Sequence, residues 1–173
     1  DSSTFTLFSE VMKGVGRHRK DDGKKKGGLK VHMLTDIHAD TAVFATISEA
    51  KMHDKKFLAH LNPAKGSMLV FDKAYNFYQQ FADWTREGVN FVCRLKDNAK
   101  AQLQEVLFEK NLTKEEFGVY KIGHIHLEYK REKKPETLCL RLVYYKDEKG
   151  RKYKFITNNW EITPEEVALI YKY

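Results

Sequence analysis

Cysteine is scarce in this chain, whose 173 residues include two cysteines and no Cys-x-x-Cys pair. A zinc ribbon or a disulfide scaffold needs more cysteines at short spacing, so neither class of protein is indicated. Cys93 and Cys139 each lie within an apolar, strand-like run. We therefore expect two buried free thiols, which fits a protein of the reducing cytoplasm.

Long apolar runs are missing as well. No run approaches 18 apolar residues and no signal peptide is recognisable, so a membrane span is not predicted. The chain begins at Asp1 without an initiator Met and ends at Tyr173 within a helical pattern. We interpret it as a fragment of a longer protein.

Aromatic and basic residues, in contrast, are plentiful. Hydrophobic residues make up 42% of the chain, with 11 Phe and 9 Tyr, which is enough for one domain with a real core. The net charge of +7 favours a polyanionic partner, most simply nucleic acid. An acidic protein would fit this charge equally well.

The first half of the chain has the pattern of alternating strands and helices. Strands are expected at residues 4–8, 29–35, 41–47, 67–71 and 90–95, and helices from Asp54 to Pro63 and from Phe77 to Gly88. The short polar link that contains Asp36 and Asp40 predicts a turn between antiparallel strands. The strand–helix–strand order predicts an α/β fold with parallel strands in its sheet.

The second half changes in character and predicts a β-rich insertion at residues 99–154, between a core of residues 1–98 and a return to it at 155–173. Leu103, Val106 and Leu107 recur at helical spacing and predict a helix. Strands are expected at residues 119–129, 137–145 and 153–157. The sequence Thr163-Pro164-Glu165-Glu166 combines a capping box with proline at the first helical position, and predicts a final helix.

Two aspartates stand where a strand can deliver a carboxylate to the edge of a sheet. Asp72 follows four apolar residues, and Asp1 precedes the first strand-like segment. Paired carboxylates on neighbouring strands suit a Mg²⁺ site for phosphoryl transfer, in which two ions lie about 4 Å apart. An aspartate at a strand end can equally form a turn or cap a helix.

An ordered set of motifs resembles the catalytic domain of DDE-type insertion-sequence transposases. The set comprises Asp1–Ser3, Gly28–His32, His53–Asp54, Val70–Phe77, Phe91–Lys96, Asn158–Asn159 and Thr163–Tyr171. Residues 70–77 match the block of the second aspartate, apolar–Asp–x–Ala–Tyr. The resemblance covers nearly the whole chain and is weakest across the β-rich insertion.

The resemblance implies an RNase H-like mixed sheet flanked by helices, with the β-rich insertion before a helix that bears the catalytic Glu. It makes Asp1 and Asp72 catalytic ligands of Mg²⁺ or Mn²⁺, and Tyr75, His53 and Tyr171 supporting motif residues. The Arg and Glu that follow the motif tyrosine in the family would lie beyond Tyr173. We therefore expect this stretch alone not to cleave DNA.

The function implied is that of a DNA transposase, which cleaves and joins strands at transposon ends and target DNA. The resemblance places such a protein in the bacterial cytoplasm, at the nucleoid when it acts, and allows a homodimer of the full-length chain. Two alternatives stay open. One is an RNase H-like nuclease without strand transfer, and the other is a non-catalytic basic DNA-binding module.

Several basic side chains are candidates for DNA contact. Lys30 and His32 alternate along one expected strand, and Arg94 and Lys96 along another, so each pair shares a face. A glycine-interrupted basic stretch adds Arg17, Arg19, Lys24, Lys25 and Lys26. Its binding to the phosphate backbone would weaken steeply with salt. An ordinary solvated surface accounts for these residues about equally well.

Overall fold

A computed structural model of the chain describes residues 2–6 and 28–172. It divides into two units, one up to His60 and one from Leu61 onward, and each unit is described by itself. Asp1 and the basic residues of the glycine-interrupted stretch (Arg17, Arg19, Lys24, Lys25 and Lys26) lie outside the described residues.

The first unit contains a three-stranded antiparallel sheet in the order β1-β2-β3, from β1 (Ser2–Thr6), β2 (Gly28–Asp36) and β3 (Thr41–Glu49). The predicted hairpin is confirmed as β2 and β3. Asp36 Oδ1 accepts the backbone amides of His38 at 2.8 Å and Ala39 at 3.2 Å, which makes it a turn residue as expected. The helix expected from Asp54 is a 3₁₀ helix, η1 (Asp54–His60), that buries Phe57 and Leu58.

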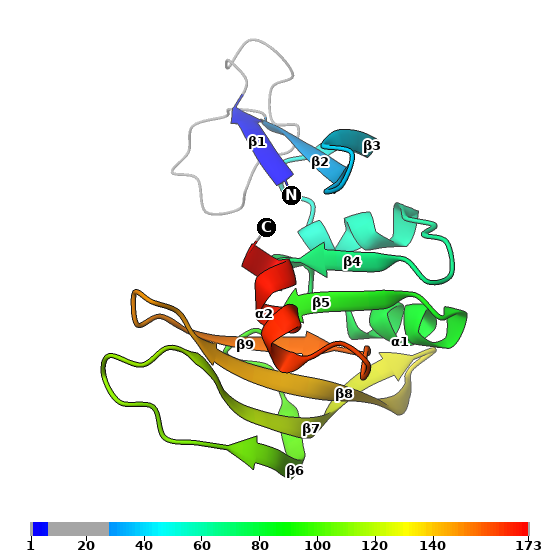
Figure 1. The fold of residues 1–173 in the computed structure, drawn as a ribbon. Helices are drawn as coiled ribbons and strands as arrows, with labels where there is room; N and C mark the ends of the chain where they lie inside the picture. Colours follow the sequence, from blue (N-terminus) through cyan, green and yellow to red (C-terminus); the bar gives the residue numbers. More distant parts are fainter. Residues whose placement is uncertain (1, 7–27, 173) are drawn as a thin grey trace, which may run out of the picture. The chain divides into compact units, whose positions relative to one another are not determined.

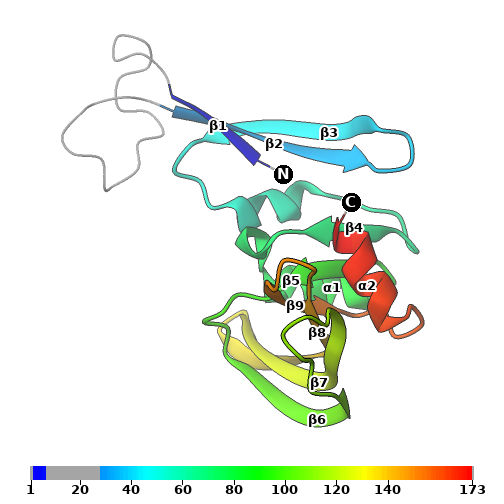
Figure 2. The same ribbon diagram turned by 60° about the vertical axis from the view of Figure 1, so that its left-hand side comes forward.

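The second unit is built on a six-stranded mixed sheet in the order β4-β5-β9-β8-β7-β6 (Figure 1). Its strands are β4 (Met68–Phe71), β5 (Asn90–Arg94), β6 (Ala101–Glu109), β7 (Gly118–Arg131), β8 (Lys134–Lys146) and β9 (Lys152–Thr157). The pair β4–β5 is parallel, as the βαβ pattern predicts, and the other pairs are antiparallel. Figure 2 shows β9, β8, β7 and β6 continuing the sheet away from β4.

Helices cover both faces of this sheet. Phe81 of α1 (Tyr78–Glu87) stacks on Phe91 of β5 with ring centroids 4.3 Å apart. The next residue of β5, Val92, points to the opposite face and belongs to a buried cluster with Val167 of α2 (Pro164–Lys172). Alternation along β5 therefore builds one core under each helix.

The predicted end of α1 and the predicted start of α2 are both confirmed. Gly88 ends α1 in the left-handed conformation with φ 74°, which glycine adopts without strain. At the start of α2, Thr163 Oγ1 accepts the Glu166 amide at 3.2 Å, and Glu166 Oε2 accepts the Thr163 amide at 2.6 Å. This is the reciprocal capping box, followed by Pro164 as the first helical residue.

The helix predicted through Leu103, Val106 and Leu107 is wrong, because these residues lie in strand β6. Its pairing with β7 shifts register between Leu103 and Glu105 and again between Val106 and Phe108. Each bulge inserts one residue and breaks the period of two. The apolar residues of β6 consequently fall at a spacing that imitates a helix.

The two cysteines differ in burial. Cys93 is buried, as predicted, but Cys139 is exposed, so that half of the prediction is wrong. Alternation along β8 explains it, since Leu138 and Leu140 are buried on one face and Cys139 points to the other. Among the described residues, the helices are too short or too polar to cross a membrane.

Candidate active site at the ends of β4 and β5

Asp72 directly follows β4, at the edge of the sheet where two parallel strands end. Leu69 and Phe71 are buried and fix the strand, while Asp72 itself is partly exposed. Phe71 pairs with Cys93, so the end of β4 lies beside Arg94 at the end of β5. The sequence therefore delivers a carboxylate to the edge at which parallel strands present their carboxyl ends.

Tyr171 of α2 reaches this carboxylate. Its hydroxyl donates a hydrogen bond of 3.0 Å to Asp72 Oδ1, and its ring packs against Phe155 with centroids 4.8 Å apart. Burial, and next the bond to Asp72, raise the pKa of the Tyr171 hydroxyl, so it stays a neutral donor at pH 7. The structure thus brings together two residues that the sequence motifs place 99 positions apart.

Asn76 fixes the backbone that follows Asp72. Its side chain is buried, and Nδ2 donates to the Arg94 carbonyl and to Cys93 Sγ, each at 2.9 Å. Asn76 Oδ1 accepts the Lys96 amide at 3.2 Å. The loop after β4 is therefore tied to the end of β5 by side-chain bonds.

Cys93 lies directly behind Asp72, and its Sγ is 3.6 Å from the Asp72 carbonyl oxygen. Burial, and next the charge of Asp72, raise the pKa of the Cys93 thiol, so it remains protonated and is not a nucleophile.

Sequence analysis overlooked the role of Asn76. The signal available was a polar residue between Tyr75 and Phe77, in the same motif block as Asp72.

Basic side chains flank the carboxylate. Arg94 stacks its guanidinium over the Tyr153 ring at 5.1 Å, and its charge lowers the pKa of Tyr171, which partly offsets the effect of burial. Lys96 is partly exposed just beyond β5. Lys73, next to Asp72, forms an exposed ion pair of 3.5 Å with Asp97. This edge of the sheet therefore combines the carboxylates of Asp72 and Asp97 with three basic side chains.

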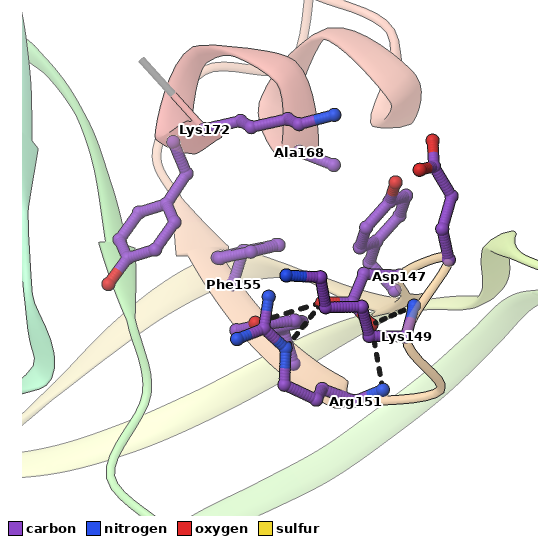
Figure 3. Close-up of a pocket in the computed structure, with 10 residues that line it drawn as sticks. Asp147, Lys149, Arg151, Phe155, Ala168 and Lys172 are labelled. Carbon is purple, nitrogen blue, oxygen red and sulfur yellow. Dashed lines mark hydrogen bonds and ion pairs between the residues drawn. The ribbon is translucent and has the colours of Figure 1, made fainter.

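A cavity of about 350 Å³ lies beside Tyr171, between α2 and the turn that joins β8 to β9. Figure 3 shows Ala168 and Lys172 on one side of it, with Asp147 and Arg151 on the other. Asp147 Oδ2 accepts a bond of 2.6 Å from Arg151 Nε, which holds the turn together. The cavity adds an aromatic floor and a charged rim to the same edge of the sheet.

The comparison with family models decides the identity of the chain. The model described as transposase DDE domain matches residues 1–173. The chain belongs to the transposase DDE domain family. No curated protein matches it significantly. The transposase domain accordingly belongs to a family that acts on DNA and generally depends on a divalent metal.

Asp72 is chemically suited to hold such a metal in the transposase domain. A carboxylate has about four lone-pair positions, and the described contacts of Asp72 use one of them, for Tyr171. Its hard oxygens are ligands that Mg²⁺ prefers. Within residues 2–6 and 28–172, however, no group of three or more potential metal ligands occurs. The other expected ligand, Asp1, lies outside these ranges.

Of the remaining predicted residues in the second unit, Tyr75 is buried and 5.9 Å from the Phe71 ring, so it supports the packing of β4. His124 and His126 lie two residues apart in β7 and share one face of the strand. His124 contacts the Trp160 ring edge-on at 4.7 Å and pairs with Glu105 at 3.4 Å. These contacts describe a surface of the sheet and not a metal centre.

The predicted DNA-facing pair of β2 points inward. The side chain of His32 is 0% exposed and its ring stacks on Phe57 at 5.1 Å, so the prediction that His32 contacts DNA is wrong. Lys30 Nζ donates to Asp54 Oδ1 at 2.9 Å and to the Met52 carbonyl at 3.1 Å, which neutralises its charge. This face of the hairpin packs on η1.

The carboxylate of Asp54 organises the first unit around His32. Asp54 Oδ1 also accepts the Ser2 hydroxyl at 3.2 Å and lies 3.9 Å from His32 Nδ1. Burial lowers the pKa of His32, although Asp54 opposes this shift, so the imidazole is neutral at pH 7. The neighbouring His53 is exposed, and its carbonyl accepts the Lys56 amide at 3.0 Å at the start of η1.

Proposed function

We propose that this domain performs metal-dependent DNA strand cleavage and strand transfer at transposon ends. Asp72 is one carboxylate ligand of Mg²⁺ or Mn²⁺, and Asp1 is the second. The observation that carries the proposal is the position of Asp72 after β4, with its carboxylate held by Tyr171 of α2. By the family resemblance, we expect the third carboxylate on the helix that carries the motif tyrosine.

The divalent ions, when bound, supply activation of the attacking oxygen and charge neutralisation at the leaving oxygen. The residues of the chain do the positioning. The Tyr171 hydroxyl orients the Asp72 carboxylate by holding one of its oxygens. Asn76 keeps the loop after β4 against the end of β5. A fixed carboxylate lowers the cost of reorganisation during the reaction.

Arg94 and Lys96 lie at the same edge and act on the DNA backbone. Both residues are partly exposed. They lie at the end of β5, beside the end of β4 that Asp72 follows. Neutralised phosphates release counterions, which draws DNA to this edge without reading its sequence. Recognition of specific transposon ends is expected to rest on other regions of a transposase.

The test uses a transposase chain that carries this domain together with the third carboxylate of the family. The substrate is a plasmid that bears the element with its own ends, incubated with Mg²⁺ or Mn²⁺. Asp72→Asn keeps the shape of the side chain and removes its charge. We expect it to abolish cleavage while DNA binding, measured by gel shift, stays unchanged.

The matched control is Asp36→Asn, because asparagine can still accept the two turn amides at that exposed position. This variant should cleave as the unmodified protein does. Normal cleavage by Asp72→Asn would contradict the metal-ligand assignment. Products that are cut but never joined to target DNA would instead support the nuclease alternative.

A further inference from the structure

A row of lysine and tyrosine side chains crosses the sheet near the candidate active site. In the register of the strands, Lys121 of β7 pairs with Tyr144 of β8, and Tyr144 pairs with Lys154 of β9. The ammonium groups of Lys121 and Lys154 lie 6.0 and 5.9 Å from the centroid of the Tyr144 ring. Both lysines thus make cation–π contacts with one tyrosine.

A second lysine and tyrosine extend this row. Tyr120, at the bulge of β7, lies 5.7 Å from Tyr144 between ring centroids, and Lys152 Nζ lies 5.8 Å from the Tyr120 centroid. We name these five residues (Lys121, Tyr144, Lys154, Tyr120 and Lys152) the lysine–tyrosine surface. It belongs to three adjacent strands, so its spacing is fixed by the sheet.

The surface reaches the end of the sheet that bears Asp72, on the face opposite to α2. Tyr144 alternates along β8 with Val143 and Tyr145, which pack in the cluster under α2, so its ring points to the other face. The backbone amide of Leu95, just after β5, donates to the Lys154 carbonyl at 2.8 Å. From Lys154 the row therefore continues to the end of β5, and β4 with Asp72 is the next strand. Two strand spacings of about 4.8 Å separate β9 from β4, so within the plane of the sheet the two strands are about 10 Å apart.

The charge of the surface is positive and largely uncompensated. Lys121 pairs with Glu109 at 3.0 Å, but none of the ion pairs within the described residues involves Lys152 or Lys154. Both of these lysines are exposed. Because ammonium groups already lie over the tyrosine rings, the surface offers charge and hydroxyl donors in place of open faces for stacking.

We propose that the lysine–tyrosine surface binds the phosphodiester backbone of DNA that passes the end of the sheet bearing Asp72. This inference rests on the proposed function, because it takes DNA as the substrate of the neighbouring site. Ammonium groups and tyrosine hydroxyls donate to phosphate oxygens without regard to base sequence. The surface therefore positions DNA along the sheet and does not recognise a sequence.

The test is fluorescence anisotropy of a labelled 20-base-pair duplex of arbitrary sequence with the 173-residue chain, at rising salt. The double variant Lys152→Gln/Lys154→Gln removes two phosphate contacts. The slope of log affinity against log salt concentration should become less steep by about 1.8. Between 50 and 200 mM salt, the unmodified chain should lose about twelvefold more affinity than the variant.

The matched control is Lys130→Gln/Lys133→Gln, which removes two exposed lysines near the β7–β8 turn, at the other end of the same strands. It lowers the net charge equally and should leave the salt dependence nearly unchanged. Equal effects of the two double variants would overturn the proposal, as would an absence of DNA binding by the unmodified chain at 50 mM salt.

Two further readouts separate this inference from its alternatives. If Tyr144→Leu weakens the binding of a single-stranded 20-mer at high salt and Tyr144→Phe, which keeps the ring and lacks the hydroxyl, does not, the surface stacks bases and the backbone proposal is wrong. Failure of the double variant to change binding, while Asp72→Asn still abolishes cleavage in the transposase, would overturn this surface and leave the proposed function intact. If instead the double variant weakens binding while Asp72→Asn leaves cleavage normal, the surface is supported and the metal site is contradicted.

Discussion

Replacing Asn76 by alanine should destabilise the second unit and loosen the loop that carries Asp72. The substitution removes the bonds from Asn76 to the Arg94 carbonyl and the Lys96 amide. A buried polar group left without a partner costs about 1–3 kcal/mol. Both hydrogen bonds are only partly buried, so we take the lower end of this range for each. We expect a total loss of about 2 kcal/mol, from a typical 5–15 kcal/mol for a domain.

The assay is urea unfolding followed by tryptophan fluorescence, because both tryptophans, Trp84 and Trp160, lie in the second unit. With a slope near 2 kcal/mol per molar urea, the midpoint should fall by about 1 M. Exchange of the Lys96 amide hydrogen should also become faster, because its acceptor on Asn76 is gone.

The control is Asn98→Ala, which alters an exposed turn residue and should change stability by less than about 0.5 kcal/mol. If Asn76→Ala unfolds at the same urea concentration as the unmodified chain, and Lys96 exchange is unchanged, the side-chain bonds do not hold the loop. The positioning role assigned to Asn76 would then be refuted.

Three further substitutions test other parts of the fold. Gly123→Ala should separate β6 from β7 and destabilise the sheet, because a Cβ there would lie 2.5 Å from the Glu105 carbonyl oxygen; unchanged hydrogen exchange in β6 would contradict this. By NMR titration, His32 should have a pKa below 6.5, and Asp54→Asn should lower it further because the Asp54 charge favours the protonated form. An upward shift in that variant would show that Asp54 does not act on His32. Thr163→Ala should cost about 1 kcal/mol through loss of the cap on α2, and no change in the unfolding midpoint would argue against it.

The pH dependence of the first unit follows from the pKa of His32. Because this pKa is lower in the folded state than its ordinary value of 6.5, the unfolded chain takes up the proton first as pH falls. The contribution of His32 to stability is therefore complete above pH 6.5 and is lost on acidification through its folded pKa.

Much of the fold of the second unit was predictable because its signals are local. The turn of α1 into the next strand is encoded by Gly88, and the start of α2 by Thr163 and Glu166. Asp72 could be found because it follows a short buried strand within a motif block. Such signals depend on neighbours in the chain, and the folded structure retains them.

The features that sequence analysis missed depend on register between strands. The bulges in β6 disguised a strand as a helix, since they shift the apolar pattern out of its period of two. Alternation alone does not say which face of β8 is buried, so Cys139 was assigned to the wrong side. The bonds of Asn76 and the lysine–tyrosine surface join residues that become neighbours only when the sheet is assembled.

His32 was assigned to the wrong environment for a related reason. A strand with alternating polar residues predicts that one face meets solvent or ligand, but it does not reveal what packs on that face. In the structure, η1 supplies Phe57 and Asp54 to the face that bears Lys30 and His32. His32 is therefore buried against η1.

The central claim is that Asp72 binds the divalent metal, and NMR spectroscopy of the 173-residue chain with added Mn²⁺ tests it most directly. A paramagnetic ion at Asp72 should selectively broaden the amide signals of Lys73, Arg94 and their neighbours at low Mn²⁺ concentration. Asp72→Asn should remove this broadening, or require at least about tenfold more Mn²⁺, corresponding to 1.4 kcal/mol of binding free energy. Asp36→Asn should leave it unchanged. Equal broadening of these signals in the Asp72→Asn protein would contradict the assignment.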